Sequence, residues 1–424
     1  MSIRPLLLFS ALAAALPGWC QSPVATAPAP GLTLTQVLIA ARDSSEVIQS
    51  RHALSAAQAD IRSADHAPAP TLSLGAQSID LQNGMGGGNL VTRKRIDKSL
   101  GVDWTWERGN KRALRTQAAQ RNADAAQADV EDAQTQQQQA ALAAYYDLLA
   151  AQERVQETQA IEQDMAELAR LATRRVKAGD LSEQDAARTH IETERARTDT
   201  QSAEIEREQA ATALAQIIAR DTALPACACD WPARIDAPPA PGDLAAWAES
   251  RPDVRAALAR VQAAQAALDN AEALRKADVT VGASFHHFPG TSTRMVELRA
   301  QFPLQWGYQF EGEIGRAQAE YAHAQEVLDK ARRIALLELQ SLHKTLSGAA
   351  QRAVRYDSAI LPKARQVAQS AEMAYTKGAI SLTDLLDARR TLRATTLDGL
   401  AARADYAKAQ GQWLLRTQPQ TLVP

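Results

Sequence analysis

The sequence predicts a mainly α-helical protein with a β-barrel portion that several subunits must build together. Three observations predict this fold class. The 424-residue chain repeats its own pattern once, two long stretches contain neither glycine nor proline, and four short segments alternate apolar with polar residues. Long unbroken stretches favour helices, and strict alternation favours strands that are apolar on one face.

The composition excludes several classes of protein. Basic and acidic residues nearly balance, 47 against 49, for a formal net charge of −2, which excludes a strongly basic nucleic-acid binder. Three cysteines are too few to stabilise a chain of this length by disulfides, which excludes a disulfide-rich scaffold. The sequence contains no Walker loop, no HExxH and no GxSxG motif, so we expect neither an enzyme nor a bound cofactor.

The first segment is predicted to direct export from the cytoplasm. Arg4 precedes an apolar run over residues 6–16, which fits a secretory signal peptide and is too short to span a bilayer. We assign residues 1–20 to this signal and 21–34 to an extended tether. Cys20 could instead carry a lipid, although a tryptophan precedes it where lipidation signals normally have a small residue. No later apolar run reaches 18 residues, so passage through a membrane would need a β-barrel.

The repeat divides the rest of the chain into two halves. Glu46 and Gly75 correspond to Asp253 and Gly282 at one offset (253 − 46 = 282 − 75 = 207). Each half reads as a helix, two strands, a long helix, a turn and a second helix. The first helix is expected over residues 35–66. We expect the first repeat over 35–224, a Pro-rich linker over 225–242, the second repeat over 243–416 and a tail over 417–424.

The long helices are predicted from the absence of glycine and proline. No glycine or proline occurs between Asn110 and Ala178, and a second such stretch runs from Asp180 to Leu224. At 1.5 Å per residue, the first stretch would span on the order of 100 Å as one helix. Because Gly179 separates them, the two stretches predict a helical hairpin of the coiled-coil type.

Four segments show the alternation of barrel strands. Residues 100–106 place an apolar side chain at every second position, and residues 71–76, 279–286 and 296–306 show the same pattern. The apolar side chains would face outer-membrane lipid and the polar ones a lumen. A soluble amphipathic hairpin would alternate for the same reason. A barrel needs about eight strands, so subunits must share it, and three subunits would supply twelve.

Two kinds of motif complete the pattern. The sequence Gly-x-[Leu/Ile]-Ser-x-x-Asp occurs twice, from Gly179 and from Gly378, and residues 106–112 (Trp-Glu-Arg-Gly-Asn-Lys-Arg) follow the second strand. With the doubled layout, these motifs make the sequence resemble the TolC-like outer-membrane efflux proteins. The segment 106–112 resembles the CzcC-like branch, which serves heavy-metal efflux. The resemblance implies a homotrimer, with a twelve-stranded β-barrel in the outer membrane of a Gram-negative bacterium and a long α-helical barrel in the periplasm.

The resemblance also implies a function. Such channels are not enzymes; they are passive exit ducts that dock onto a periplasmic adaptor and an inner-membrane RND pump. Heavy-metal cations are the expected cargo. Drugs or other organic solutes, or type I secretion, are alternatives on the same fold. A periplasmic coiled-coil adaptor or scaffold is an alternative of another class, although adaptors usually carry one hairpin among small β domains and this chain has two.

The main candidate site residues follow the second turn. In the resembling family, the acidic positions that match Asp384 and Asp387 form carboxylate rings at the periplasmic entrance. Three residues apart on a helix, they share a face, and such rings favour cations. Ser381 and Asp384 also have the spacing of a capping box. We therefore expect both roles for Asp384 and the gate for Asp387.

The first turn repeats the capping pattern without the second acidic residue. Ser182 and Asp185 have the same spacing as a capping box, and we expect Asp185 to act as a cap. Tyr375 matches a family position that helps to latch the closed state. Ile380 stands where the family has the arginine partner of that latch, so Tyr375 could equally be a packing residue.

Weaker metal-site candidates remain. Cys227 and Cys229 in the linker could capture a soft metal, form a local disulfide, or do neither; a closed zinc site takes four ligands. His286 and its neighbour His287 point to opposite faces of a strand, so they cannot chelate one ion together. With Met295 near a hairpin loop, and Met85 near the other, a transient metal path and ordinary polar residues are both open readings.

Overall fold

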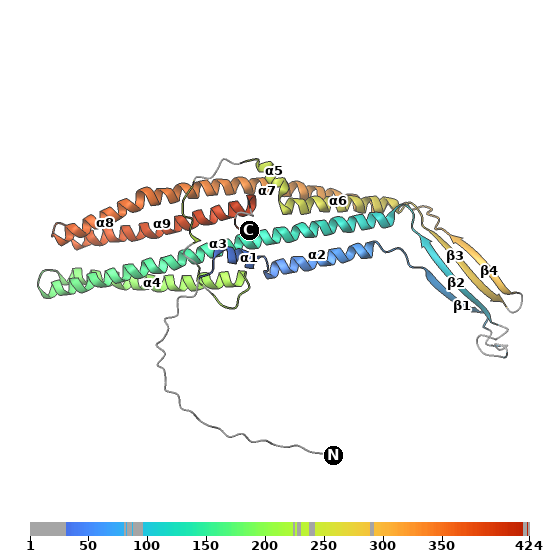
Figure 1. Cartoon of the computed structure of the whole chain (residues 1–424), viewed down its shortest axis with the longest axis horizontal. Helices are drawn as coiled ribbons and strands as arrows, with labels where there is room; N and C mark the ends of the chain where they lie inside the picture. Colours follow the sequence, from blue (N-terminus) through green and yellow to red (C-terminus); the bar gives the residue numbers. More distant parts are fainter. Residues whose placement is uncertain are drawn as a thin grey trace, which may run out of the picture.

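The computed structural model describes residues 31–79, 82, 87, 96–223, 225–226, 230–236, 242–288, 292–418 and 422. Two helical hairpins lie along one half of an elongated molecule, and a β-sheet extends from its opposite end (Figure 1). In the described part of the chain, no helix is both long enough and apolar enough to span a membrane.

Helices and strands follow each other in nearly the same order in the two halves. The first half contains α1 (Leu34–Ala41), α2 (Ser45–Ala64), β1 (Thr71–Gln77), β2 (Asp97–Trp106), α3 (Lys111–Lys177) and α4 (Glu183–Ile217). The second contains α5 (Leu244–Ser250), α6 (Pro252–Ala273), β3 (Val279–Phe288), β4 (Ser292–Gln301), α7 (Glu311–Arg355), the π-helical turn η2 (Tyr356–Ile360), α8 (Leu361–Thr376) and α9 (Leu382–Thr417). The chain is mainly α-helical with a small β portion, as predicted.

The helix α3 is the element on which both halves pack. It is continuous over 67 residues, or about 100 Å at 1.5 Å per residue, which confirms the expectation from its lack of glycine and proline. Gly109 and Asn110 precede it with positive φ angles of 79° and 58°, and they turn the chain from β2 into the helix. Along its length α3 contacts α2, α4, α6 and α9.

The predicted first helix is interrupted. The sequence predicts one helix over residues 35–66, whereas residues 42–44 separate α1 from α2. Ser44 has an extended backbone as the N-cap of α2, and the Arg51 side chain donates a hydrogen bond to the Arg42 carbonyl (3.0 Å). That bond satisfies a carbonyl that a continuous helix would have used. The partner lies nine residues away, so helical periodicity gave no sign of the break.

The four strands form one antiparallel sheet in the order β1-β2-β3-β4. The central pairing of β2 with β3 therefore joins the two halves. Leu72, Val102, Ala283 and Leu298 lie in one register row, and the leucines and the valine are exposed, Leu298 to 81%. The sequence predicts the last strand to continue to Trp306, but β4 ends at Gln301. Proline 303 has no N–H for a further ladder bond.

A wide helical turn separates α7 from α8. The π-helical turn η2 covers Tyr356–Ile360, and Pro362 follows it after one residue, as the second residue of α8. Proline has no N–H to donate to the carbonyl four residues earlier, which is that of Ser358. The helix continues past this missing bond by widening locally. The corresponding helix of the first half, α3, has no proline and no such turn.

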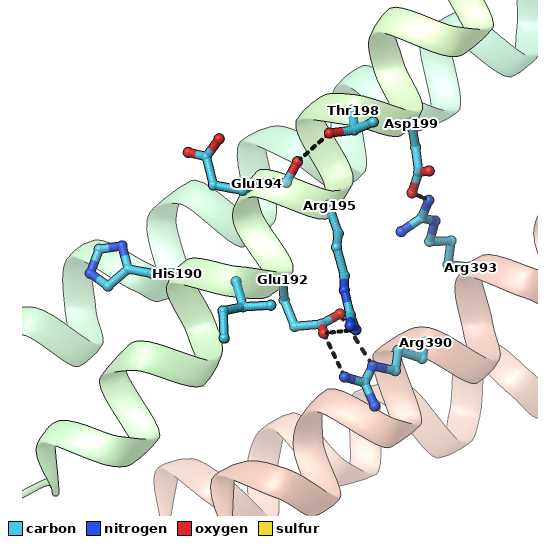
Figure 2. Close-up of a pocket in the computed structure, with 9 residues that line it drawn as sticks. His190, Glu192, Glu194, Arg195, Thr198, Asp199, Arg390 and Arg393 are labelled. Atoms are coloured by element: carbon cyan, nitrogen blue, oxygen red, sulfur yellow. Dashed lines mark hydrogen bonds and ion pairs between the residues drawn. The ribbon is translucent and has the colours of Figure 1, made fainter.

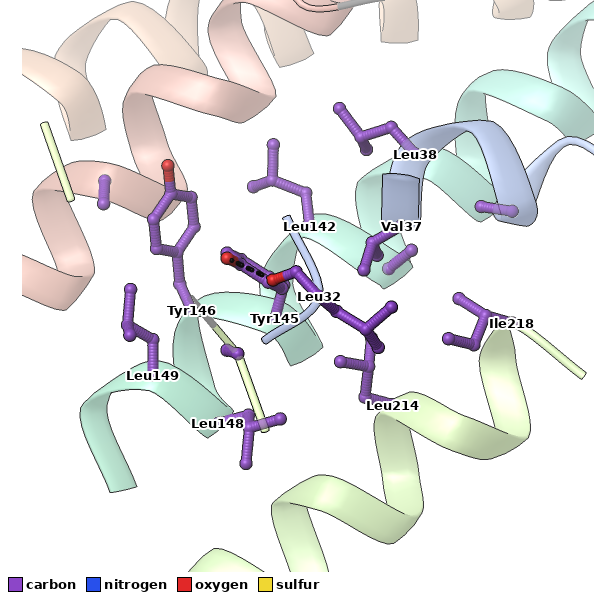
Figure 3. Close-up of a cluster of buried hydrophobic side chains, with 14 of the residues drawn as sticks. Leu32, Val37, Leu38, Leu142, Tyr145, Tyr146, Leu148, Leu149, Leu214 and Ile218 are labelled. Atoms are coloured by element: carbon purple, nitrogen blue, oxygen red, sulfur yellow. Dashed lines mark hydrogen bonds between the residues drawn. The ribbon is translucent and has the colours of Figure 1, made fainter. Parts of the chain in front are cut away.

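A buried cluster fixes the N-terminal segment to the middle of the molecule (Figure 3). It contains Val37 and Leu38 of α1 together with apolar residues of α3, α4 and α9. The Tyr145 hydroxyl lies within hydrogen-bonding distance of the Leu32 carbonyl (3.0 Å) and of the Asp230 carboxylate. Apolar burial supplies the stability here, and the tyrosine determines where the linker and the N-terminal segment attach.

A buried network of charges joins the two halves near the same level. Arg251 pairs with Asp253 (2.8 Å) and Glu338 (2.9 Å), and Arg416 pairs with Glu338 (3.3 Å) and Asp132 (3.5 Å). Both arginines are buried, so each needs its carboxylates. Burial and the nearby Asp253 raise the pKa of Asp132, against the lowering effect of Arg416. The network brings together α3, α6, α7 and α9.

Candidate functional site

The two hairpins end in turns of the same design. Gly179 and Gly378 have φ angles of 80° and 72°, a conformation that glycine adopts without strain. The Asp180 amide donates to the Arg175 carbonyl (2.9 Å), and the Ala379 amide donates to the carbonyl five residues earlier (2.8 Å). This is the Schellman arrangement, which satisfies the last carbonyls of a helix. The structure therefore gives both predicted turn glycines a backbone role.

The serine of each turn caps the following helix. The Ser182 hydroxyl accepts from the Asp185 amide (3.1 Å), and the Ser381 hydroxyl accepts from the Asp384 amide (3.2 Å). In the second turn the Asp384 carboxylate also accepts from the Ser381 amide (3.1 Å), which completes a capping box. Bonds from the Ser381 hydroxyl and amide lower the pKa of Asp384.

Asp387 lies on the same exposed side of α9, but its carboxylate takes no part in the helix cap. Among the described residues, its carboxylate forms no hydrogen bond or salt bridge within the chain. Its negative charge acts on Arg390, one turn further along, and helps to raise the pKa of that guanidinium. Of the two acidic candidates, Asp384 is the one whose carboxylate takes part in the cap.

Tyr375 lies in the small core of the hairpin tips. It is buried at the end of α8 and packs with Leu168, Leu385 and other apolar residues of both hairpins. The Arg175 guanidinium of α3 lies over its ring, 5.2 Å from the centroid, a cation–π distance. Tyr375 therefore contacts the other hairpin through Arg175, and Ile380 packs against the same cluster.

Ion pairs between α4 and α9 also connect the hairpins (Figure 2). Glu192 of α4 pairs with Arg390 of α9 (2.6 Å) and with Arg195 (2.8 Å). Arg393 of α9 pairs with Asp199 of α4. Glu192 is largely buried, and the pairing with Arg390 is the main cause of its lowered pKa.

This link was not predicted from the sequence, although the charges have a recognisable spacing. The acidic residues are seven apart on one helix and the arginines three apart on the other, so each pair lies on one helix face. The spacing does not predict that α4 faces α9, because the paired residues are about 200 positions apart in the chain.

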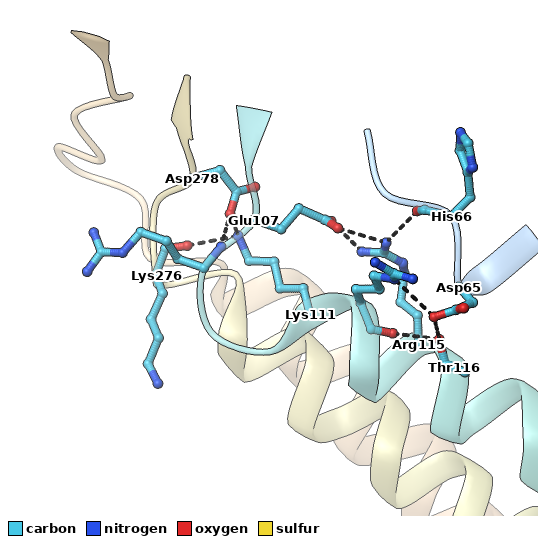
Figure 4. A network of polar contacts seen from close by, with 10 residues as sticks. Asp65, His66, Glu107, Lys111, Arg115, Thr116, Lys276 and Asp278 are labelled. Carbon is cyan, nitrogen blue, oxygen red and sulfur yellow. Dashed lines mark hydrogen bonds and ion pairs between the residues drawn. The ribbon is translucent and has the colours of Figure 1, made fainter. Parts of the chain in front are cut away.

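The segment 106–112 builds the joint between sheet and helices (Figure 4). Lys111 is buried, and its ammonium bonds the Asp278 carboxylate (2.8 Å) and the Lys276 carbonyl (2.8 Å). The Arg108 amide donates to the same carboxylate (2.9 Å). Glu107 pairs with the guanidinium of an arginine one turn into α3 (2.6 Å). The motif thus ties the end of β2 to the start of β3, which belongs to the other half.

Several sequence-based candidates cannot be placed. Cys20, Cys227, Cys229 and Met85 lie outside the described residues. Within the described ranges, no group of three or more histidine, cysteine, aspartate or glutamate side chains is arranged to hold a metal ion. His286 and His287 are consecutive residues of β3, whose pairing with β2 is regular there, so their side chains lie on opposite faces of the sheet.

Comparisons with known proteins agree with this architecture. The profile of the outer membrane efflux protein family matches residues 39–220 and 245–413. The cobalt-zinc-cadmium resistance protein CzcC of Cupriavidus metallidurans is 26% identical over 308 residues, covering 72% of this chain and 72% of that protein. A membrane protein from Pseudomonas aeruginosa superposes with a TM-score of 0.77 at 19% identity, covering 91% of this chain and 90% of that one. The Campylobacter jejuni CmeC outer membrane channel superposes with a TM-score of 0.74 at 13% identity, covering 96% and 94%.

The family profile covers most of the chain, and its two matched segments correspond to the two structural halves. The superposed structures share the whole fold, from the sheet to the hairpins. The predicted resemblance is therefore confirmed, and the chain belongs to the outer membrane efflux protein family.

Proposed function

We propose that this protein is the passive exit duct of a tripartite efflux system and that its cargo is heavy-metal cations. The observation that carries the proposal is the four-stranded sheet, exposed and apolar on one face and polar on the other, joined to about 100 Å of helix. The similarity to a protein named for cobalt, zinc and cadmium resistance supports the choice of cargo.

The duct requires more than one copy of the chain. In the described structure, β1 and β4 are the outer strands of the sheet, each paired on one side. Unpaired strand edges cannot persist in a lipid bilayer, because lipid offers no hydrogen-bond partners to their backbone groups. A homotrimer closes both edges with twelve strands, and its helices form the barrel below. The apolar face then contacts outer-membrane lipid, and the polar face lines the lumen.

The entrance of the duct lies at the hairpin tips. In the trimer, three copies of Asp387 surround the axis and favour cations over anions. Asp384 adds its charge while it also caps α9. The ion pairs Glu192–Arg390 and Asp199–Arg393 connect the hairpins of each protomer. No reaction is catalysed; a periplasmic adaptor docks at the tips, and an RND pump in the inner membrane supplies the energy.

A susceptibility panel on a strain that lacks the gene tests the function. The panel compares zinc, cobalt, cadmium, nickel, copper and silver salts with dyes and antibiotics. We expect sensitivity to one or two of the metals, restored by the intact gene. Sensitivity to organic compounds with unchanged metal tolerance would refute the cargo and indicate a drug or solvent exporter on the same fold.

A further inference from the structure

The polar face of the sheet carries a side-chain cluster that the proposed function leaves unused. Ser284 and His286 of β3 lie opposite Glu297 and Met295 of β4, in two register rows that are separated by one row. Residues two apart on a strand share a face, so all four side chains lie on the polar side. The strands extend away from the helices (Figure 1), and His286 is close to the β3–β4 turn at their far end.

The contacts of this cluster converge on one nitrogen atom. His286 Nε2 lies 3.0 Å from Glu297 Oε2 and 2.8 Å from Ser284 Oγ. The imidazole stacks on Phe288, with ring centroids 5.2 Å apart and planes at 29°. The His286 side chain is 16% exposed and that of Glu297 is 49% exposed. The nitrogen is therefore held in position, and the carboxylate beside it stays accessible.

The His286 nitrogen and the Glu297 carboxylate can meet through a hydrogen bond or through a cation held between them. An imidazole Nε2 has either one N–H or one lone pair. An N–H can donate to the Glu297 carboxylate, whereas a bare lone pair is repelled by it. A cation between the nitrogen and the carboxylate interacts favourably with both. Metal–ligand bonds of about 2.0–2.2 Å place neighbouring ligand atoms about 3.0–3.5 Å apart, depending on the coordination geometry, so a bound ion needs only a small adjustment of Nε2 and Oε2 from their separation of 3.0 Å.

We propose that Ser284, His286, Met295 and Glu297 form a transit site for a divalent metal cation near the outer mouth of the duct. This inference rests on the proposed function and names a binding site for its cargo. Imidazole and carboxylate suit zinc and cobalt, and a thioether adds preference for softer ions such as cadmium. Met295 is the register partner of His286, so its thioether is within cross-strand reach.

The ligand set is suited to passing a cation on rather than retaining it. Only His286 and Glu297 are strong ligands, and a closed zinc site takes four. The remaining positions are left to water, and conduction requires sites from which an ion can leave. Arg299, two residues beyond Glu297 on the same face, pairs with Asp103, so its charge is compensated. A trimer holds three such sites around the lumen.

Zinc binding to the full-length protein, purified in detergent, tests the site by isothermal titration calorimetry. Four variants are compared with the wild type: His286→Gln, Glu297→Gln, Met295→Leu and His287→Gln. His287 is the matched control, because it is the same residue type one position along and on the opposite face. We expect His286→Gln to weaken zinc binding at least about tenfold and Glu297→Gln to weaken it severalfold, with His287→Gln within twofold of wild type.

Cadmium provides a second readout. Met295→Leu keeps the side-chain volume and removes the thioether, so it should weaken cadmium binding more than zinc binding. The site is refuted if His286→Gln and Glu297→Gln bind zinc as the wild type does, or if His287→Gln loses as much affinity as His286→Gln. Should His286→Gln fail to assemble, the Glu297→Gln and Met295→Leu results decide in the same way.

The failure of this site and the failure of the proposed function give different results. Loss of zinc binding in His286→Gln, together with a deletion strain that tolerates metals, would keep the site and refute the cargo. A metal-sensitive deletion strain whose duct binds zinc equally well with and without His286 would keep the cargo and refute the site.

Discussion

Asp384 and Asp387 lie three residues apart at the start of α9, yet their carboxylates have different surroundings. Asp384 accepts from both the amide and the hydroxyl of Ser381. Asp387 has no such bond within the described part of the protomer. The cap gives Asp384 a role in the local fold, whereas the role that we propose for Asp387 is at the lumen. The two positions should therefore respond differently to mutation.

Replacement of the capping serine tests the first role. Ser381→Ala removes the acceptor for the Asp384 amide and should destabilise the start of α9 by about 1 kcal/mol. Hydrogen exchange of the amides in the first turn of α9 should become faster, while channel conductance at neutral pH changes little. Ser182→Ala is the matched control: it should accelerate exchange in α4 and leave α9 as it was. Unchanged exchange in α9 would show that the cap contributes nothing.

Acidification should release the same cap. The pKa of Asp384 is lowered in the folded protein, so its contribution is complete above the unfolded value of about 3.9. The contribution is lost as the pH falls through the lowered folded pKa. Exchange in the first turn of α9 should therefore accelerate only in that acidic range. Acceleration that begins near neutral pH would contradict the assignment.

Neutralisation of Asp387 tests the second role. Asp387→Asn removes three charges from the axis of a trimer and should reduce the preference for cations severalfold in planar-bilayer recordings. Thermal stability should stay close to that of the wild type, because within the described part of the protomer the carboxylate forms no hydrogen bond or salt bridge and acts only through its charge on Arg390. Asp185→Asn, in the other turn, is the control and should leave selectivity unchanged. Equal selectivity in Asp387→Asn and wild type would remove Asp387 from the gate.

At the scale of elements, ion pairs connect the two helical hairpins, and the segment 106–112 joins the sheet to the helices. The Glu192–Arg390 pair links α4 with α9. Lys111 and Asp278 link α3 with the start of β3. Both links cross between the two halves of the chain. They hold the repeated units in one relative position, which sequence repetition alone does not determine.

Loss of the Lys111–Asp278 ion pair should lower the free energy of unfolding more than loss of the exposed Arg112–Asp65 pair. Lys111→Met leaves the Asp278 carboxylate with the Arg108 amide as its remaining partner there. Because the lysine is buried and the aspartate partly exposed, a loss of about 1–3 kcal/mol is expected. Thermal unfolding of the purified protein measures this loss. Arg112→Gln is the control, since its partner Asp65 is exposed; an equally large loss in that variant would contradict the account.

At the scale of the whole molecule, the sequence predicted the fold well because its main signals are local. Continuous helix follows from the absence of glycine and proline over residues 111–177, and the sheet follows from alternation within each strand. The turn glycines and capping serines were also predictable, because their partners lie within five residues.

The features that the sequence did not predict depend on distant contacts. Arg51 stabilises the break between α1 and α2 from nine residues away. Glu192 meets Arg390 across the interface of the two halves, and Arg175 meets Tyr375 in the same way. Pairing of this kind requires knowledge of which helices are neighbours. The sequence therefore placed the two turns and their caps correctly along the chain, while the contacts between the hairpins became clear only in three dimensions.

The most direct test of the account is the location and mass of the native protein. The shared barrel requires that the protein be extracted from the outer membrane by detergent as a particle of three chains, measured by light scattering with the detergent contribution subtracted. We expect this particle to resist carbonate extraction from membranes and to separate into single chains on heating in SDS. A monomer in the soluble periplasmic fraction would contradict the shared barrel, and with it the exit duct.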